Sequence, residues 1–280
     1  MRGSRLFMFL ALSWFVGWPG PVAAQPDDRY QLRLECVYTG VGAKAEVPVV
    51  LDAVQGTLGF PEAMTGWSFG ICNDAALTLN SVALGTATAT ANGGSAPDFS
   101  AVNMTPGMGN GFTWAVVISH FGQHTLPPGT GLEMLLVSYT VNGTPGQTLP
   151  LQFCSTLGVP AMAVQIGLAG GSSIEPEIQD CDVTVLHNYV RGDCTGDASV
   201  NLTDAVYSLS YLFGVPGTAP PECARACDAD ASGSLNILDP VTTLQSLFGP
   251  MPTPLAPPNT CGVDGLPSLP LDCVEVPQCP

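Results

Sequence analysis

An internal repeat is the feature of this sequence that most limits its fold. Residues 193–214 align with residues 228–249 at an offset of 35 positions. Within each copy, apolar residues recur at three- and four-residue spacing, which predicts one face of a short helix. The repeat therefore predicts two copies of one acidic loop followed by one helix. The identical positions are Asp193/Asp228, Ser199/Ser234, Asn201/Asn236, Asp204/Asp239, Val206/Val241, Leu209/Leu244, Leu212/Leu247, Phe213/Phe248 and Gly214/Gly249.

Each copy begins with oxygen-bearing side chains in the spacing of a twelve-residue calcium loop. Calcium is a hard cation that takes about six to eight oxygen ligands, and a tight loop supplies them at alternating positions. We therefore expect two Ca²⁺ sites, with the two position 7 serines contributing backbone carbonyls. The predicted ligands are Asp193, Thr195, Asp197, Ser199, Asn201 and Asp204 in the first loop, and Asp228, Asp230, Ser232, Ser234, Asn236 and Asp239 in the second.

The alternative is that these segments are acidic turns that cap helices, because Asp, Asn and Ser are common there. Two copies in register, each followed by the same helical pattern, favour calcium. Three carboxylates around one point repel each other without a cation, so we expect metal binding and loop ordering to be coupled. The metal-free module should be loose.

The two loops look like the paired loops of dockerin domains, over about 60 residues of the chain. Asp at position 12 and the missing helix before each loop both fit this resemblance. It implies a module that docks onto a cohesin-type β-sandwich through its loop and helix segments. The recognition positions 10 and 11 would be Leu202-Thr203 and Ile237-Leu238, and these pairs differ from each other.

Three residues depart from the dockerin pattern. Thr195 and Ser232 replace charged or amide ligands, and Ala198 replaces the glycine expected at position 6. A left-handed alanine there would cost about 1 kcal/mol. We therefore expect moderate calcium affinity at both loops.

The N-terminus has the pattern of a secretory signal peptide. Arg2 and Arg5 precede an apolar run over residues 6–18, and small residues then lead to a cleavage site after Ala24. The run is shorter than the ~20 residues that a membrane-spanning helix needs. We predict a signal peptide over residues 1–24, a secreted, extracellular protein and no membrane span.

Composition excludes some partners of such an exported chain. The formal net charge of −16 makes nucleic acid and anionic membranes poor partners. Ten cysteines predict disulfides rather than a redox or zinc site. Cys36, Cys72, Cys154 and Cys181 fall in or beside predicted strands, so two disulfides are expected there, with their pairing open.

Residues 25–187 contain many short apolar runs separated by Gly, Pro, Asn and Ser, which is typical of a two-sheet β-sandwich. Residues 86–100 and 105–111 are rich in small polar residues and are expected to be surface loops. Segments 47–51, 66–71 and 126–129 resemble those of cohesin-like and carbohydrate-binding sandwiches. The expected strands are 30–38, 46–53, 66–73, 76–83, 112–119, 131–141, 148–154, 161–167 and 181–186.

The expected fold class is therefore mainly β. It combines an antiparallel β-sandwich of cohesin-like or jelly-roll type (residues 25–187) with a small all-α, dockerin-like module carrying two calcium loops (188–250). A Pro- and Cys-rich tail (251–280) should be extended and tied down by Cys261, Cys273 and Cys279.

Several motifs suggest other chemistry. Residues 66–70 fit the G-x-S-x-G element of hydrolases, but the alternation of apolar residues predicts a strand instead. His120 and His124 have the spacing of a zinc helix, yet no glutamate follows His120 and loop histidines are expected. Trp67 and Trp114 could stack on sugars, although a place in the sandwich core is the more usual role of such residues.

These features predict a secreted, non-catalytic, calcium-binding attachment or scaffold protein whose partner is a cohesin-like domain. The alternative is an extracellular carbohydrate-binding protein linked to polysaccharide degradation, in which the sandwich binds the polysaccharide and calcium is only structural. A glycoside hydrolase would need two of the scattered carboxylates to meet as an acid and base pair, and no enzyme is predicted.

Overall fold

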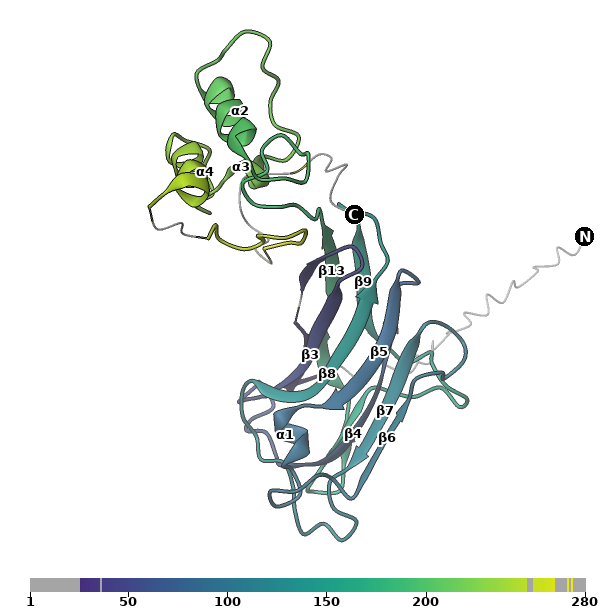
Figure 1. The fold of residues 1–280 in the computed structure, drawn as a ribbon. Coiled ribbons are helices and arrows are strands. Elements are labelled where there is room, and N and C mark those ends of the chain that lie inside the picture. Colours follow the sequence, from purple (N-terminus) through teal and green to yellow (C-terminus); the bar gives the residue numbers. More distant parts are fainter. Residues whose placement is uncertain (1–25, 36, 251–253, 265–270, 272, 274–280) are drawn as a thin grey trace, which may run out of the picture.

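The computed structural model describes residues 26–35, 37–250, 254–264, 271 and 273. The predicted signal peptide (1–24), Cys36 and Cys279 lie outside the described residues. Figure 1 shows a β-sandwich with a helical module beyond one of its ends. Among the described residues, no helix is both long and apolar enough to cross a bilayer.

The first sheet has five strands in the order β12-β1-β3-β8-β5. Its long central strands alternate between buried and more exposed residues, as in β3, where Ala45, Val47 and Val49 face the core. The strands are β1 (Asp27–Leu34), β3 (Lys44–Ala53), β5 (Leu77–Leu84), β8 (Leu132–Val141) and β12 (Pro176–Gln179).

The second sheet has eight strands, arranged around β4 (Met64–Asn73). Along one edge, β4 pairs with β7, and β7 pairs in turn with β6. Along the other edge, the first half of β4 pairs with β10 and its second half pairs with β9. The remaining strands are β2 (Tyr38–Gly40), β6 (Phe99–Asn103), β7 (Gly111–Val117), β9 (Thr148–Cys154), β10 (Gln165–Leu168), β11 (Ser173–Ile174) and β13 (Cys181–Leu186).

The core between the sheets is built around aromatic rings. Trp114 is fully buried and makes edge contacts with Trp67 at 5.8 Å and with Phe69 at 5.3 Å between ring centroids. Tyr139 reaches the same core from the opposite sheet. A disulfide joins Cys72 of β4 to Cys154 of β9, two neighbouring strands of one sheet.

The structure corrects two expectations about the sandwich. The sheets are not purely antiparallel, because β1 pairs with β12 and β2 pairs with β13 in parallel. The segment 86–100 is not all loop: it holds α1 (Thr86–Ala89) and the start of β6. α1 is held by fully buried Thr88, whose hydroxyl donates to the Met134 carbonyl at 2.8 Å.

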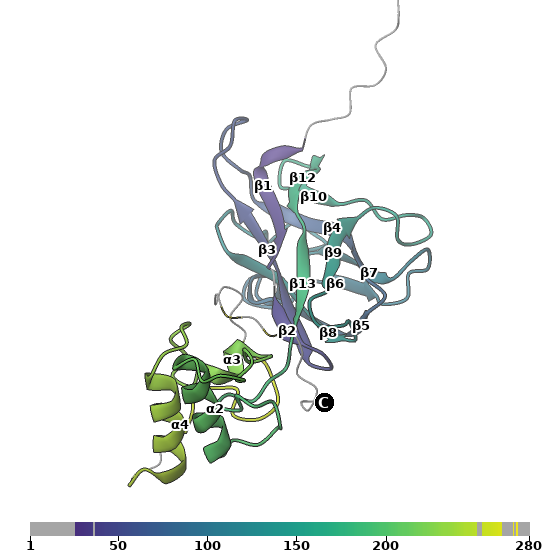
Figure 2. The same ribbon diagram turned by 90° about the horizontal axis from the view of Figure 1, so that it is seen from above.

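The module contains α2 (Leu202–Leu212), α3 (Ala224–Cys227) and α4 (Leu238–Phe248). α2 and α4 pack side by side (Figure 2). The buried positions are small or polar and obey the repeat: Ala205 corresponds to Pro240, and Ser208 to Thr243. Small contact residues bring the two helices close together.

The tail residues that the structure describes belong to the module. Tyr189 pairs with Gly262 as an isolated bridge, and the Arg191 N–H donates to the Pro258 carbonyl at 2.7 Å. A disulfide joins Cys223 to Cys273. The prediction that cysteines tie down the tail is therefore confirmed for Cys273.

Candidate functional site

The first predicted calcium loop closes around the carboxylate of Asp193, at position 1. This group accepts the backbone N–H groups of Gly196, Asp197 and Ala198 at 2.8, 3.0 and 2.8 Å. Asp193 is buried, with 4% of its surface exposed. The chain thus folds back around the first ligand, so that positions 4 to 6 form a tight turn beside it.

Asp204, at position 12, joins this loop to α2. Its carboxylate accepts the backbone N–H and the hydroxyl of Thr195 at 2.9 and 2.8 Å, and the backbone N–H of Asn201 at 2.8 Å. The Asn201 amide oxygen accepts the Thr203 N–H at 2.8 Å and so caps the helix. One carboxylate therefore holds both the loop and the first turn of α2.

The second loop repeats this arrangement. Asp228 accepts the N–H groups of Ser232 and Gly233 at 3.0 and 2.9 Å, and Asp239 accepts the Asn236 N–H at 2.7 Å. Candidate ligand atoms of Asp228, Asp230 and Asp239 all lie within 4.8 Å of one another. This convergence of hard oxygen ligands suits a calcium ion.

The predicted ligands at positions 5 and 7 are exposed, namely Asp197, Ser199, Ser232 and Ser234. Asp197 is turned back to its own loop, where it accepts the Ser199 N–H at 2.9 Å. The position 7 carbonyls of Ser199 and Ser234 accept the amide N–H groups of Asn201 and Asn236 at 3.3 and 3.0 Å. Among the described residues, the second loop alone brings three carboxylates within 4.8 Å of one another, and Asp193, Asp197 and Asp204 of the first loop do not form such a group.

Both loops carry an alanine in a left-handed conformation. Ala198 at position 6 has φ 66°, as expected from the sequence, and Ala231 at position 4 of the second loop has φ 59°. Glycines hold the matching positions in the other copy, Gly196 with φ 73° and Gly233 with φ 79°. Sequence reasoning missed Ala231, although comparing position 4 between the copies would have revealed it.

Relieving this strain should stabilise the module. A left-handed alanine costs about 1 kcal/mol, and glycine's greater freedom in the unfolded chain offsets part of the gain. We expect Ala198→Gly and Ala231→Gly each to raise the free energy of unfolding by about 0.5 kcal/mol. Gly196→Ala is the reverse control, because an added Cβ there would meet nothing within 4 Å and only the backbone conformation changes. Equal melting temperatures for all three variants would contradict the assignment.

Burial perturbs the acidic groups of the loops. Burial raises the pKa of Asp239 to about 6, against the hydrogen bonds from Asn236 and Asp230. Burial also raises the pKa of Asp193 and of Asp228. At Asp230 burial acts in the same direction, but hydrogen bonds with Ser232, Asp228 and Asp239 together lower the pKa. The metal-free loops therefore hold carboxylates that resist ionisation.

The pH dependence of the module follows from Asp239. Its pKa in the fold lies above the value of about 3.9 for an unfolded aspartate, so its contribution to stability is full below about pH 4 and is lost as the pH rises through 6. Calcium requires the carboxylate. We expect the metal-free module to melt higher at pH 5 than at pH 7, and the rise in melting temperature on adding calcium to be smaller at pH 5. Thermal scans with chelator and with calcium measure both, and a parallel pH trend in the two conditions would contradict this.

The two loops are linked by a disulfide and a buried arginine. Cys194 and Cys227, beside the two position 1 aspartates, form the disulfide. Arg191 is 1% exposed, and its guanidinium donates to the Asp228 carbonyl at 2.6 Å and to the Asp264 carboxylate at 3.1 Å. Residues 191–193 also have the Arg-Gly-Asp sequence of an adhesion tripeptide, but the burial of Arg191 keeps it from being an exposed adhesion motif.

Each helix also presents an apolar stripe to solvent. The spacing of these residues indicated a helical face, but not that it would remain uncovered. Phe213 is 72% exposed and Phe248 is 67% exposed. The α2 stripe consists of Leu202, Val206, Leu209 and Phe213, and the α4 stripe of Ile237, Val241, Leu244 and Phe248, with Leu209 and Leu244 half-buried.

The competing motifs have structural roles. Ser68 lies within β4 and donates to the Ala163 carbonyl at 3.0 Å, as expected of a strand residue and not of a nucleophile elbow. His120 and His124 lie outside helices and strands, as predicted. Trp67 and Trp114 are 4% and 0% exposed, so neither ring can stack on a sugar.

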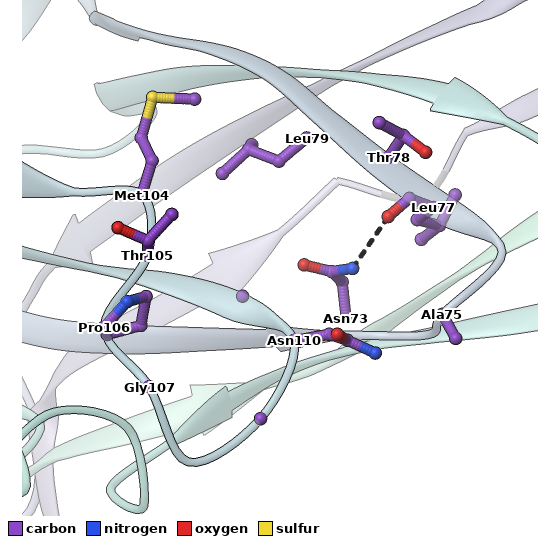
Figure 3. A pocket seen from close by; sticks show the side chains of 12 residues that line it. Asn73, Ala75, Leu77, Thr78, Leu79, Met104, Thr105, Pro106, Gly107 and Asn110 are labelled. Atoms are coloured by element: carbon purple, nitrogen blue, oxygen red, sulfur yellow. Dashed lines mark hydrogen bonds between the residues drawn. The ribbon is translucent and has the colours of Figure 1, made fainter.

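The sandwich has a cleft of about 510 Å³ between β5 and the turn that joins β6 to β7 (Figure 3). Amide and hydroxyl groups of Asn73, Asn110 and Thr105 line it, and Met104 and Leu79 add apolar surface. The Asn73 amide nitrogen is engaged with the Leu77 carbonyl at 2.9 Å. No charged side chain and no aromatic ring is among the described lining residues.

The solved structures that are similar to this chain match its N-terminal β-sandwich. No family model and no curated protein matches the sequence. A type I cohesin–dockerin complex from Clostridium thermocellum is 13% identical, with a TM-score of 0.44 over 57% of this chain and 100% of that chain. A ScaB type I cohesin from Pseudobacteroides cellulosolvens is 17% identical (TM-score 0.42; 56% and 91% of the two chains), and a non-cellulosomal cohesin from Archaeoglobus fulgidus is 12% identical (0.39; 56% and 91%).

These solved structures are cohesin domains. The likeness covers the N-terminal β-sandwich and extends no further along the chain. It concerns the fold alone, and the dockerin resemblance of the C-terminal module stays a prediction.

Proposed function

We propose that this chain is a secreted, non-catalytic attachment protein whose C-terminal module binds two calcium ions and docks onto another protein. The dockerin resemblance implies a cohesin-type β-sandwich as that partner. The observation that supports docking most directly is the duplicated apolar stripe. Exposed apolar surface of this kind on a small module marks an interaction site.

Calcium would act by holding the two stripes in place. Asp204 and Asp239 each belong both to a loop and to the first turn of a helix. Neutralising the crowded carboxylates with a cation would order both loops and so fix α2 against α4. The partner would then meet two preoriented stripes.

The test is calcium-dependent binding to a panel of immobilised cohesin domains. We expect binding in calcium and its loss in chelator. Phe213→Ser and Phe248→Ser change the two stripes separately, and both side chains are exposed, so the fold should not change. If the two stripes are equivalent, each single variant binds and the double variant does not.

Two controls make this test decisive. Phe60→Ser removes a side chain of similar exposure, 74%, from a sandwich loop and should leave binding intact. Circular dichroism of the double variant must show unchanged helix. Binding that survives in the double variant, or that does not respond to chelator, would refute docking through the stripes.

Glycan binding remains a second candidate because of the uncharged cleft beside β5. Its amides and hydroxyls could bond sugar hydroxyls, and Met104 could contact a sugar ring. The cleft lacks an aromatic platform among its described residues, which weakens this reading. Affinity electrophoresis in neutral polysaccharides tests it, with Asn110→Ala as the variant expected to lose any retardation.

A further inference from the structure

The edge of the second sheet at β6 is open. All five residues of β6 are exposed, and the strand pairs only with β7 (Figure 1). On its β4 side, β7 bonds through its flanking residues Asn110 and Ile118, because the Asn73 N–H donates to the Asn110 carbonyl and the Ile118 N–H donates to the Thr65 carbonyl. Bonded residues alternate along a strand, so the odd-numbered residues of β7 face β6 and bond Phe99, Ala101 and Asn103. The backbone groups of Ser100 and Val102 therefore point away from the sheet.

This edge lacks the protection that the other described edge strands carry. Natural sheets guard their edges with charges, proline, bulges or very short strands. Among the described edges, β12 begins with Pro176 and carries Glu177, β5 has a register shift, and β11 and β2 have two and three residues. β6 has neither proline nor charge, and Phe99 and Val102 are 43% and 38% exposed.

The distribution of charge along the chain favours a second copy as the partner of this edge. The chain carries a net charge of −16, so most of its surfaces repel a second copy. Residues 75–132 are different, because they contain one charged side chain, Asp98. A second copy meets the least repulsion at β6.

The register of β6 is also self-complementary. If two copies pair in antiparallel fashion about Ala101, then Ser100 lies opposite Val102 of the other copy, and the outward groups of these two residues form about four hydrogen bonds. Phe99 then packs diagonally against the other Ala101. The two Asp98 side chains would be about 20 Å apart, beyond the screening length at physiological salt.

We infer that β6 joins two copies of this chain edge to edge, with a two-fold axis at Ala101. The pairing makes one continuous sheet from the two second sheets. Such an isologous contact closes the assembly at a dimer. It leaves the stripes of α2 and α4 free, so this inference is independent of the proposed docking function.

Sedimentation velocity of the mature, calcium-loaded chain tests the dimer over a wide concentration range. We expect the mass to double as concentration rises. Val102→Pro removes an outward N–H while leaving the β7 ladder intact, so it should abolish the dimer without unfolding the sandwich. Val102→Thr keeps the N–H and should retain the dimer.

Two oppositely charged variants at Ala101 test the position of the two-fold axis. Ala101→Lys and Ala101→Glu should each be monomeric, because like charges would face each other across the axis, and an equal mixture of the two should restore the dimer mass. A wild-type chain that stays monomeric would overturn the inference. A dimer that persists in Val102→Pro, or that disappears in the Phe213→Ser, Phe248→Ser double variant, would overturn it as well.

Discussion

Replacing Arg191 by methionine is expected to unfold the C-terminal module while the sandwich stays folded. The guanidinium is 1% exposed and donates to Asp264, to the Tyr189 hydroxyl and to the carbonyls of Asp228 and Pro257. Its loss leaves the Asp264 carboxylate with less compensation in a buried place. Removing one partner of such a pair costs about 3 to 5 kcal/mol, which is a large part of the stability of a small module.

Arg33→Met is the matched control for this variant. Arg33 also binds two carboxylates, those of Asp52 and Glu35, but 28% of its side chain is exposed. Pairs of this kind contribute about 0 to 1 kcal/mol. Thermal unfolding followed by the helical circular dichroism signal compares the two variants. Similar melting curves for both would show that the buried cluster does not hold the module together.

Replacing Asp239 by alanine is expected to remove calcium binding at the second loop. Asp239 is 1% exposed, closes the loop through the N–H groups of Asn236 and Asp230, and belongs to the group of three converging carboxylates. A filled site at a calcium concentration 100 times its dissociation constant stabilises the fold by about 2.7 kcal/mol. The variant should lose this gain at one loop and keep it at the other. Isothermal titration should show the stoichiometry fall from two ions to one.

Ser234→Ala is the control for the calcium measurement. Ser234 stands at position 7, where the backbone carbonyl is the expected ligand, so removal of its hydroxyl should leave the stoichiometry at two. Ser199→Ala is the equivalent change in the first loop. If Asp239→Ala still binds two ions, the second loop is not a calcium site.

The alternation of apolar residues predicted the long strands well. Segments 46–53, 66–73, 131–141 and 148–154 correspond closely to β3, β4, β8 and β9, because each buries one face in the core. β6 carried no such signal, since all its residues are exposed. Parallel pairing of β1 with β12 was equally hidden, because partner strands distant in sequence leave no local mark.

The order of the candidate ligands in the two loops could be read from the sequence alone. A twelve-residue loop is a local structure, so the spacing of its side chains already decides which oxygens can meet. The same spacing indicated the left-handed position of Ala198. It could not reveal that Arg191 and Asp264, 73 positions apart, share a buried cluster with the second loop.

The apolar periodicity of α2 and α4 likewise showed a helical face without showing its surroundings. The helices instead bury Ala205, Ser208, Pro240 and Thr243 against each other and leave the larger side chains in solvent. Local spacing therefore determined which side chains share a loop or a helix face. Only the tertiary structure decided which face is covered, because burial depends on segments that the fold brings together from distant parts of the chain.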